Sequence, residues 1–179
     1  MIEYDSIKSS FFEANKTYCE KIEKLFKELN IDYSGYCNCW GYNVESEFIK
    51  TNLIYKLKFI KTQNSVTAGG IPRDAIDYSG FRISVSGLNK KYRFCLGKSS
   101  FIRFFTPSKF KSKIKPPSYI SYNYQSDDLL IYDLIKLFEN YEMASFRLRN
   151  GKFSIVIHYA IENPQLIITE LDKLIKVLA

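Results

Sequence analysis

The chain has 179 residues, of which 46% are hydrophobic and 16% aromatic, so it can bury a real core and is not expected to be disordered. Its 26 lysines and arginines outnumber 19 acidic residues, and the resulting net charge of +7 favours anionic partners. No apolar run is long enough to span a membrane, and the amino terminus lacks the regions of a secretory signal, so we expect one cytoplasmic domain over residues 1–179.

The first predicted element is a surface helix. Ser10 and Glu13 have capping-box spacing, and apolar residues then recur at helical intervals as far as Leu29. Asn30 is suited to the left-handed residue that ends a helix. A single buried stripe that includes Cys19 is therefore expected.

Two strands are predicted next, at Tyr36–Val44 and Phe48–Thr62, because apolar and polar residues alternate there. Cys37 and Cys39 share one face of the first strand. The segment Gln63–Arg73, rich in glycine and proline signals, is predicted to be a loop.

The four cysteines are expected to be reduced thiols of a cytoplasmic protein. A zinc site would need about four ligands, so Cys95 and His158 would have to join Cys37 and Cys39 from distant strands. No metal or other cofactor is therefore predicted.

One pentapeptide, Ile-Asp-Tyr-Ser-Gly, occurs at Ile31–Gly35 and again at Ile76–Gly80. It could be a duplicated strand-entry unit or a coincidence between two turn-rich segments. The flanking sequences do not align, which favours coincidence.

Positive charge is concentrated in the segment Tyr78–Ser126, which has ten lysines and arginines and no acidic residue. Since the chain carries +7 in total, the remainder carries −3. Such segregation points to one basic surface more strongly than the total charge does.

The first half of this basic segment is predicted to be a β-hairpin. Phe81–Val85 and Tyr92–Leu96 alternate in polarity on either side of the turn-forming residues Gly87–Lys90. Arg82 and Arg93 then lie on the polar face.

The second half alternates lysines with other residues and ends at a proline pair, before a predicted edge strand that begins at Tyr119. The lysines could protect a solvated sheet edge, or form a surface for a polyanion or an acidic partner. We treat residues 98–125 as a basic aromatic region within the domain. The candidate binding residues are Arg82, Arg93, Lys98, Arg103, Lys109, Lys111, Lys113, Lys115, Phe110, Tyr119 and Tyr122.

Three further elements complete the chain. A helix is predicted after Ser126, a second hairpin around Asn150-Gly151, and a last helix from Asn163-Pro164. The element order α-β-β-β-β-(β)-α-β-β-α predicts an α+β fold, with a mainly antiparallel sheet and helices packed on one face.

No catalytic pattern emerges. His158 is the single histidine, so every histidine-dependent site would have to include it. The remaining possibility is a divalent-metal site formed by carboxylates, namely Glu45, Glu47, Asp74 and Asp77. Acidic residues near strand ends are common, so we expect a protein that is not an enzyme.

The composition favours a small non-catalytic protein that docks an acidic protein partner on its basic aromatic surface. The alternative is a protein that binds nucleic acid, single-stranded or without sequence preference, through the same surface. The basic segment lacks the aromatic signature of an RRM and the Gly-x-x-Gly loop of a KH domain, and no other family motif is present.

Overall fold

The computed structural model describes most of the chain. The described residues are 1–5, 9–64, 67–68, 71–72, 76–90, 94–98, 119–122, 145–157 and 159–178. The helix predicted after Ser126 and the lysine run from Lys109 to Lys115 lie outside them.

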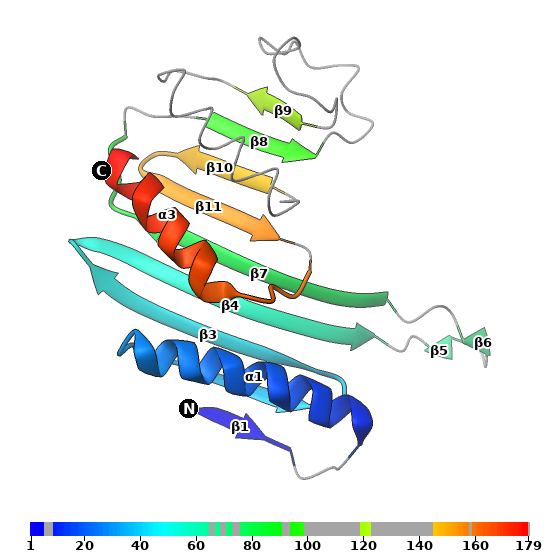
Figure 1. Ribbon diagram of the computed structural model, residues 1–179. Coiled ribbons are helices and arrows are strands. Elements are labelled where there is room, and N and C mark those ends of the chain that lie inside the picture. The colour runs from blue at the N-terminus through cyan, green and yellow to red at the C-terminus, as the bar shows by residue number, and fades with distance from the viewer. Residues whose placement is uncertain are drawn as a thin grey trace.

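A nine-stranded sheet is the centre of the described structure, in the spatial order β1-β2-β3-β4-β7-β11-β10-β8-β9 (Figure 1). Neighbouring strands are antiparallel except for β1 and β2. This confirms the predicted mixed fold with a mainly antiparallel sheet. The strands are β1 Ile2–Tyr4, β2 Ser34–Asn38, β3 Gly41–Lys50, β4 Leu53–Asn64, β7 Ile76–Ser86, β8 Phe94–Lys98, β9 Tyr119–Tyr122, β10 Ser145–Arg149 and β11 Lys152–Ile157.

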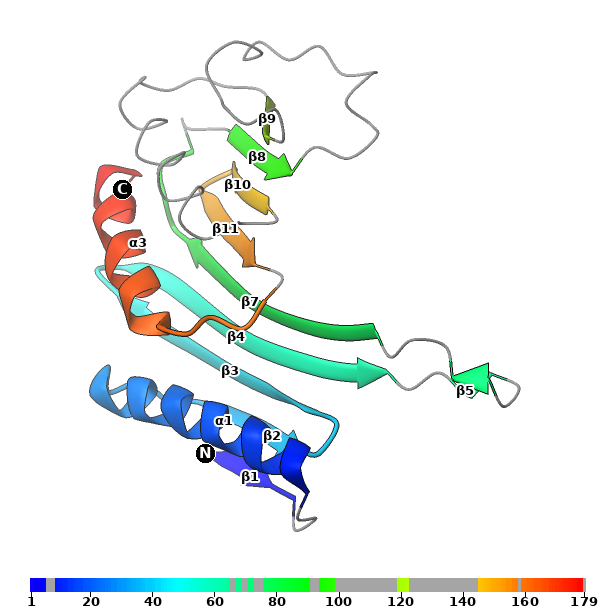
Figure 2. The ribbon, with the colours of Figure 1, turned by 45° about the vertical axis from the view of Figure 1, so that its right-hand side comes forward.

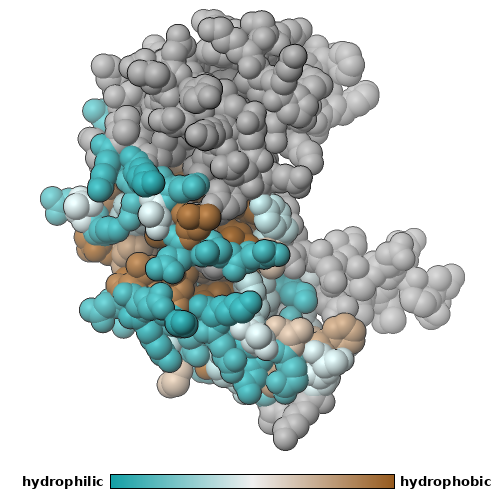
Figure 3. Space-filling model, viewed as in Figure 1, coloured by the Kyte–Doolittle hydropathy of each residue, from teal (hydrophilic) through white to brown (hydrophobic). Residues whose placement is uncertain are grey.

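Two helices, α1 (Ser10–Glu28) and α3 (Pro164–Leu178), lie on the same face of this sheet (Figures 1 and 2). The core fills the space beneath them. Phe59, at the centre of this core, packs against Phe26 of α1 at 5.9 Å and against Phe81 of β7 at 4.8 Å between ring centroids. Hydrophilic residues cover the outer sides of the helices, and hydrophobic residues show between them (Figure 3).

The ends of α1 follow local rules closely. The helix ends at Glu28 with Leu29 as its C-cap, and Asn30 takes the predicted left-handed position after the cap, with a φ of 51°. The amides of Asn30 and Ile31 donate to the carbonyls of Lys27 and Phe26. The predicted start was one residue late, because Ser9 and not Ser10 is the N-cap. The Ser9 hydroxyl accepts from the Phe12 amide at 3.1 Å.

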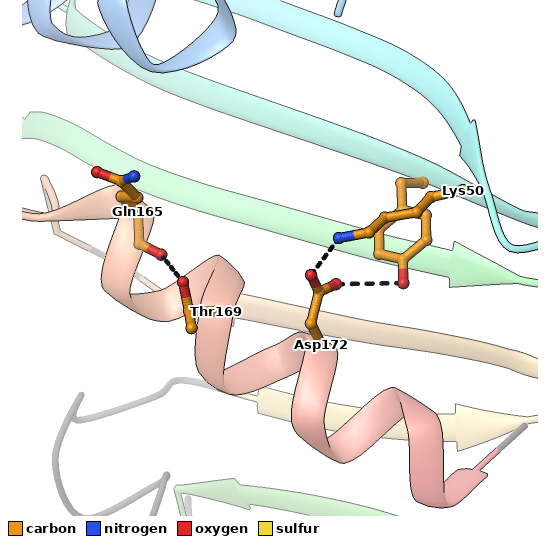
Figure 4. A network of polar contacts seen from close by, with 5 residues as sticks. Lys50, Gln165, Thr169 and Asp172 are labelled. Carbon is orange, nitrogen blue, oxygen red and sulfur yellow. Dashed lines mark hydrogen bonds and ion pairs between the residues drawn. The ribbon is translucent and has the colours of Figure 1, made fainter. Parts of the chain in front are cut away.

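Polar contacts tie α3 to the strands below it. The carboxylate of Asp172 accepts from the Tyr55 hydroxyl at 3.3 Å and forms an ion pair with Lys50, as Figure 4 shows. The Tyr18 hydroxyl of α1 donates to the carbonyl of Ile161, just before α3, at 3.1 Å. Polar contacts therefore join α3 to the sheet and α1 to the segment that precedes α3.

The two strands predicted between residues 36 and 62 are in fact three. The first breaks after Asn38, whose side-chain oxygen accepts from the amides of Trp40 and Gly41, both at 2.9 Å. Cys39 therefore lies in a turn, and it does not share a strand face with Cys37. The second breaks at Thr51-Asn52, where φ values of 49° and 62° make a tight hairpin turn between β3 and β4.

The hairpin predicted between residues 81 and 96 is wrong. β7 pairs with β4 and β11, whereas β8 pairs with β10 and β9, so two strands separate β7 from β8. After Gly87 the buried Leu88 donates its amide to the carbonyl of Gly151 at 3.0 Å, which joins this segment to the β10–β11 turn. β11 therefore pairs with the edge of β7 that β8 would occupy in the predicted hairpin.

The repeated pentapeptide has two different structures. Ile76–Gly80 lies wholly within β7, while in Ile31–Gly35 only the last two residues belong to β2. This favours coincidence over a duplicated unit. The loop predicted at Gln63–Arg73 contains the end of β4 and a two-stranded pairing of β5 (Thr67–Ala68) with β6 (Ile71–Pro72).

Candidate binding groove

The candidate site lies on the outer face of the sheet, opposite the helices. In β4 the buried residues Leu57 and Phe59 alternate with Lys56 and Lys58, so the lysines point away from α1 and α3. The same alternation holds along β3, β7, β10 and β11. None of the described helices lies on this face (Figure 2).

This face is hollowed into a groove with a volume of about 1130 Å³, which we call the outer groove. It runs across the middle of the sheet, and the loop before β2 forms one of its ends. It is lined by Asp32, Tyr33, Ser34, Glu45, Ser46, Glu47, Lys56, Leu57, Lys58, Arg82, Ile83, Ser84, Arg147, Arg149, Asn150, Lys152, Ser154, Ile155 and Val156.

On the β3–β4 side of the groove, each lysine has a carboxylate beside it. Glu47 lies opposite Lys56 in the strand register, with 2.6 Å between their charged groups. Glu45 lies opposite Lys58, at 3.4 Å. These cross-strand pairs neutralise this part of the groove.

Among the described residues, the cations on the β10–β11 side have no such neighbours. We call Arg147, Arg149 and Lys152 the basic cluster; all three are exposed. Within the described part of the chain none of the three has an ion-pair partner. Arg149 and Lys152 lie directly opposite each other, and Ser154 lies opposite Arg147.

The groove as a whole is basic, because its lining has six lysines and arginines against three carboxylates. Comparisons of this chain with family models, curated proteins and solved structures find no match. The groove must therefore be interpreted from its own chemistry. Its charge and its open shape suit an extended anionic chain better than a small molecule enclosed in a pocket.

The predicted site residues are only partly placed. Arg82 is exposed in β7 and lines the outer groove, level with Lys58 and Val156. Lys98 ends β8 and pairs with Tyr119, and Tyr122 pairs with Cys95. Arg93, Arg103, Phe110 and the four lysines Lys109, Lys111, Lys113 and Lys115 lie outside the described residues.

The basic cluster was missed from the sequence because it lies beyond the basic segment. A signal was nevertheless present in the stretch Arg147-Leu148-Arg149-Asn150-Gly151-Lys152. Asn150 and Gly151, with φ values of 53° and 71°, form the predicted tight turn. Alternation on both sides of such a turn places all three cations on one face.

The structure does not bring the carboxylate metal site together. Glu45 and Glu47 pair with lysines. Arg82 of β7 lies level with Glu45 and Lys58, and Asp77 lies five positions away from Arg82 along β7, a separation of roughly 17 Å. Asp74 and His158 lie outside the described residues. Among the residues that the structure describes, no group of three or more histidines, cysteines or acids could hold a metal ion.

Cys19, Cys37 and Cys39 are free thiols. Cys19 on α1 and Cys37 on β2 are both buried, and that burial raises the pKa of each thiol. Both are therefore protonated at neutral pH, which disfavours reaction as nucleophiles.

None of the described helices combines the length and apolar character needed to span a bilayer.

Proposed function

We propose that this protein is a non-catalytic binding protein that docks an acidic segment of a protein partner in the outer groove. The observation that carries the proposal is the basic cluster, three exposed cations side by side without carboxylate neighbours in the described structure. An acidic segment would supply the missing negative charge. The free thiols of Cys19 and Cys37 support a reducing, cytoplasmic setting.

The shape of the groove supports a chain-like ligand. The floor is an exposed sheet face, and Ser84 and Ser154 add hydroxyl groups between the charged side chains. Hydroxyls can donate to carboxylates and accept from peptide amides, so an extended peptide would find partners along its length. Each exposed ion pair is worth only about 0.2–1 kcal/mol, so we expect binding that several pairs must share.

Nucleic acid is the less favoured occupant of this groove. A strand crossing the groove would bring its phosphates close to Glu45 and Glu47, which already pair with Lys58 and Lys56, so this side of the groove would attract phosphates only weakly. The single aromatic among the lining residues, Tyr33, packs against Phe26 of α1 and donates its hydroxyl to Glu23. It is therefore not available to stack on a base, whereas single-stranded binding usually relies on several aromatic side chains. An acidic peptide can place neutral residues beside these glutamates.

The experiment compares labelled polyglutamate with a single-stranded oligonucleotide of similar charge, by fluorescence anisotropy over a salt series. We expect polyglutamate to bind more tightly, and its affinity to fall as salt increases, because exposed charges are screened. Changing the three residues of the basic cluster to glutamine should weaken polyglutamate binding by about tenfold or more.

A matched control changes three exposed lysines on the helices, Lys21, Lys173 and Lys176, to glutamine. It removes the same charge from the opposite face, so its affinity should stay close to that of the wild type. Equal losses in both variants would show that net charge and not the groove is responsible. Tight oligonucleotide binding with none of polyglutamate would favour the nucleic-acid alternative.

A further inference from the structure

We infer that the outer groove recognises an extended segment with acidic residues at alternate positions, Asp/Glu-x-Asp/Glu, aligned along β10 and β11. This inference rests on the proposed function and specifies its ligand. It concerns the spacing of the carboxylates and not merely their number.

The first argument is the spacing of the cations. Arg147 and Arg149 occupy alternate positions of one strand, which places them on the same face about 7 Å apart along it. Lys152 stands beside Arg149 and Ser154 beside Arg147. The groove thus offers two levels for a carboxylate, one with two cations and one with a cation and a hydroxyl.

An extended peptide repeats its side chains with the same period. Residues i and i+2 point to the same side and are about 7 Å apart. Two acidic residues at alternate positions can therefore reach both levels together. Two adjacent acidic residues point to opposite sides, so that only one of them can reach the groove.

The second argument is an arrangement of this kind within the protein itself. Glu45 and Glu47 occupy alternate positions of β3 and reach Lys58 and Lys56 on the adjacent strand. Side-chain pairing at this period is therefore geometrically feasible on this sheet face. In the part of the chain that the structure describes, the basic cluster repeats the cation half of the arrangement without the acidic half.

The third argument is the repulsion left inside the cluster. Arg149 and Lys152 are directly opposite each other, and like charges in that position destabilise a sheet. The carboxylate of a bound segment between them would relieve this repulsion. The level of Arg149 and Lys152 should therefore attract the first acidic residue.

The test uses labelled synthetic peptides of one composition, with two glutamates among serines. In otherwise matched peptides, the two glutamates are adjacent, separated by one serine (the alternate peptide) or separated by two serines. Fluorescence anisotropy is measured with the full chain at low ionic strength. We expect the alternate peptide to bind roughly threefold to tenfold more tightly than the adjacent one.

Substitutions at the level of Arg147 and Ser154 test the role of the spacing directly. Arg147→Gln should remove the advantage of the alternate peptide, while Arg147→Lys should keep part of it, and Lys21→Gln on α1 should leave it intact. Equal affinity for all spacings, together with binding of polyglutamate, would overturn this inference and leave the proposed function standing. If neither the peptides nor polyglutamate bind, both fail.

Discussion

At the scale of single residues, Tyr55 shows how a buried polar group is accommodated beneath α3. Its ring stacks on Phe48, with 5.1 Å between centroids, and its hydroxyl donates to Asp172. Burial first, and then the negative charge of Asp172, raise the pKa of Tyr55 from 10.0 to about 12. The contact is therefore linked to pH as well as to stability.

The sign of the linkage follows from the raised pKa. The folded state holds the Tyr55 proton more tightly than the unfolded state, so the free energy of unfolding falls as pH rises from about 10 to about 12. Tyr55→Phe should make this fall shallower, and should cost about 1 kcal/mol at neutral pH through the lost hydrogen bond. Urea unfolding at several alkaline pH values measures both effects. An unchanged slope in the variant would contradict this account of Tyr55.

At the scale of elements, the β10–β11 turn connects the groove to the rest of the sheet. Gly151 has a φ of 71°, and a methyl group on its Cα would lie 2.4 Å from the carbonyl oxygen of Leu88. The same residue accepts the hydrogen bond from Leu88 that leads the chain away from β7. A side chain at this position is therefore excluded by both backbone conformation and space.

Gly151→Ala should destabilise the fold by about 2 kcal/mol or more, because a left-handed alanine is strained and the methyl group clashes. Asn150→Gly is the matched control, since it keeps the turn conformation and should change stability by less than about 1 kcal/mol. Thermal unfolding of the two variants provides the comparison. Similar stabilities would show that Gly151 is not closely packed against Leu88.

Elements that depend on neighbouring residues could be predicted from the sequence, whereas the order of the strands could not. The left-handed Asn30 just after α1, the start of α3 at Pro164 and the Asn150-Gly151 turn depend on a few neighbouring residues, and all three predictions are confirmed. Strand order depends on competition between distant segments. β8 failed to pair with β7 because β11, far along the chain, occupies that edge.

The groove was less predictable than the elements around it. Of the predicted cations, Arg82 was correctly assigned to an outward-facing position in a strand, but its groove neighbours come from β3, β4, β10 and β11. Local charge density pointed to residues 98–125, whereas the cluster at Arg147 arises from sheet pairing. A scan of local charge cannot find residues that only the sheet brings together.

At the scale of the whole molecule, the two faces of the sheet have different roles. One face carries α1 and α3 (Figure 2) and holds the core, while the other bears the charged outer groove. The charges of the open face are divided between a neutralised β3–β4 side and a basic β10–β11 side. This division favours the β10–β11 side as the place where an acidic segment would bind.

The neutralised side offers a way to alter this balance. Glu45→Gln with Glu47→Gln frees Lys58 and Lys56 and should raise the affinity for polyglutamate severalfold, with a stability loss below about 2 kcal/mol because the pairs are exposed. The control is Glu20→Gln with Glu28→Gln, which opens two ion pairs on α1. Anisotropy with both double variants decides the point. Equal gains in the two would contradict a local effect in the groove.

The most direct test of the central claim is to locate the bound ligand. Amide chemical shifts of the isotope-labelled full chain would be followed while the alternate-glutamate peptide is added. We predict that the shifts change first and most at Arg147, Arg149, Lys152 and Ser154, with little change along α1 and α3. Saturable changes confined to the helices, with none on β10 and β11, would contradict docking in the outer groove.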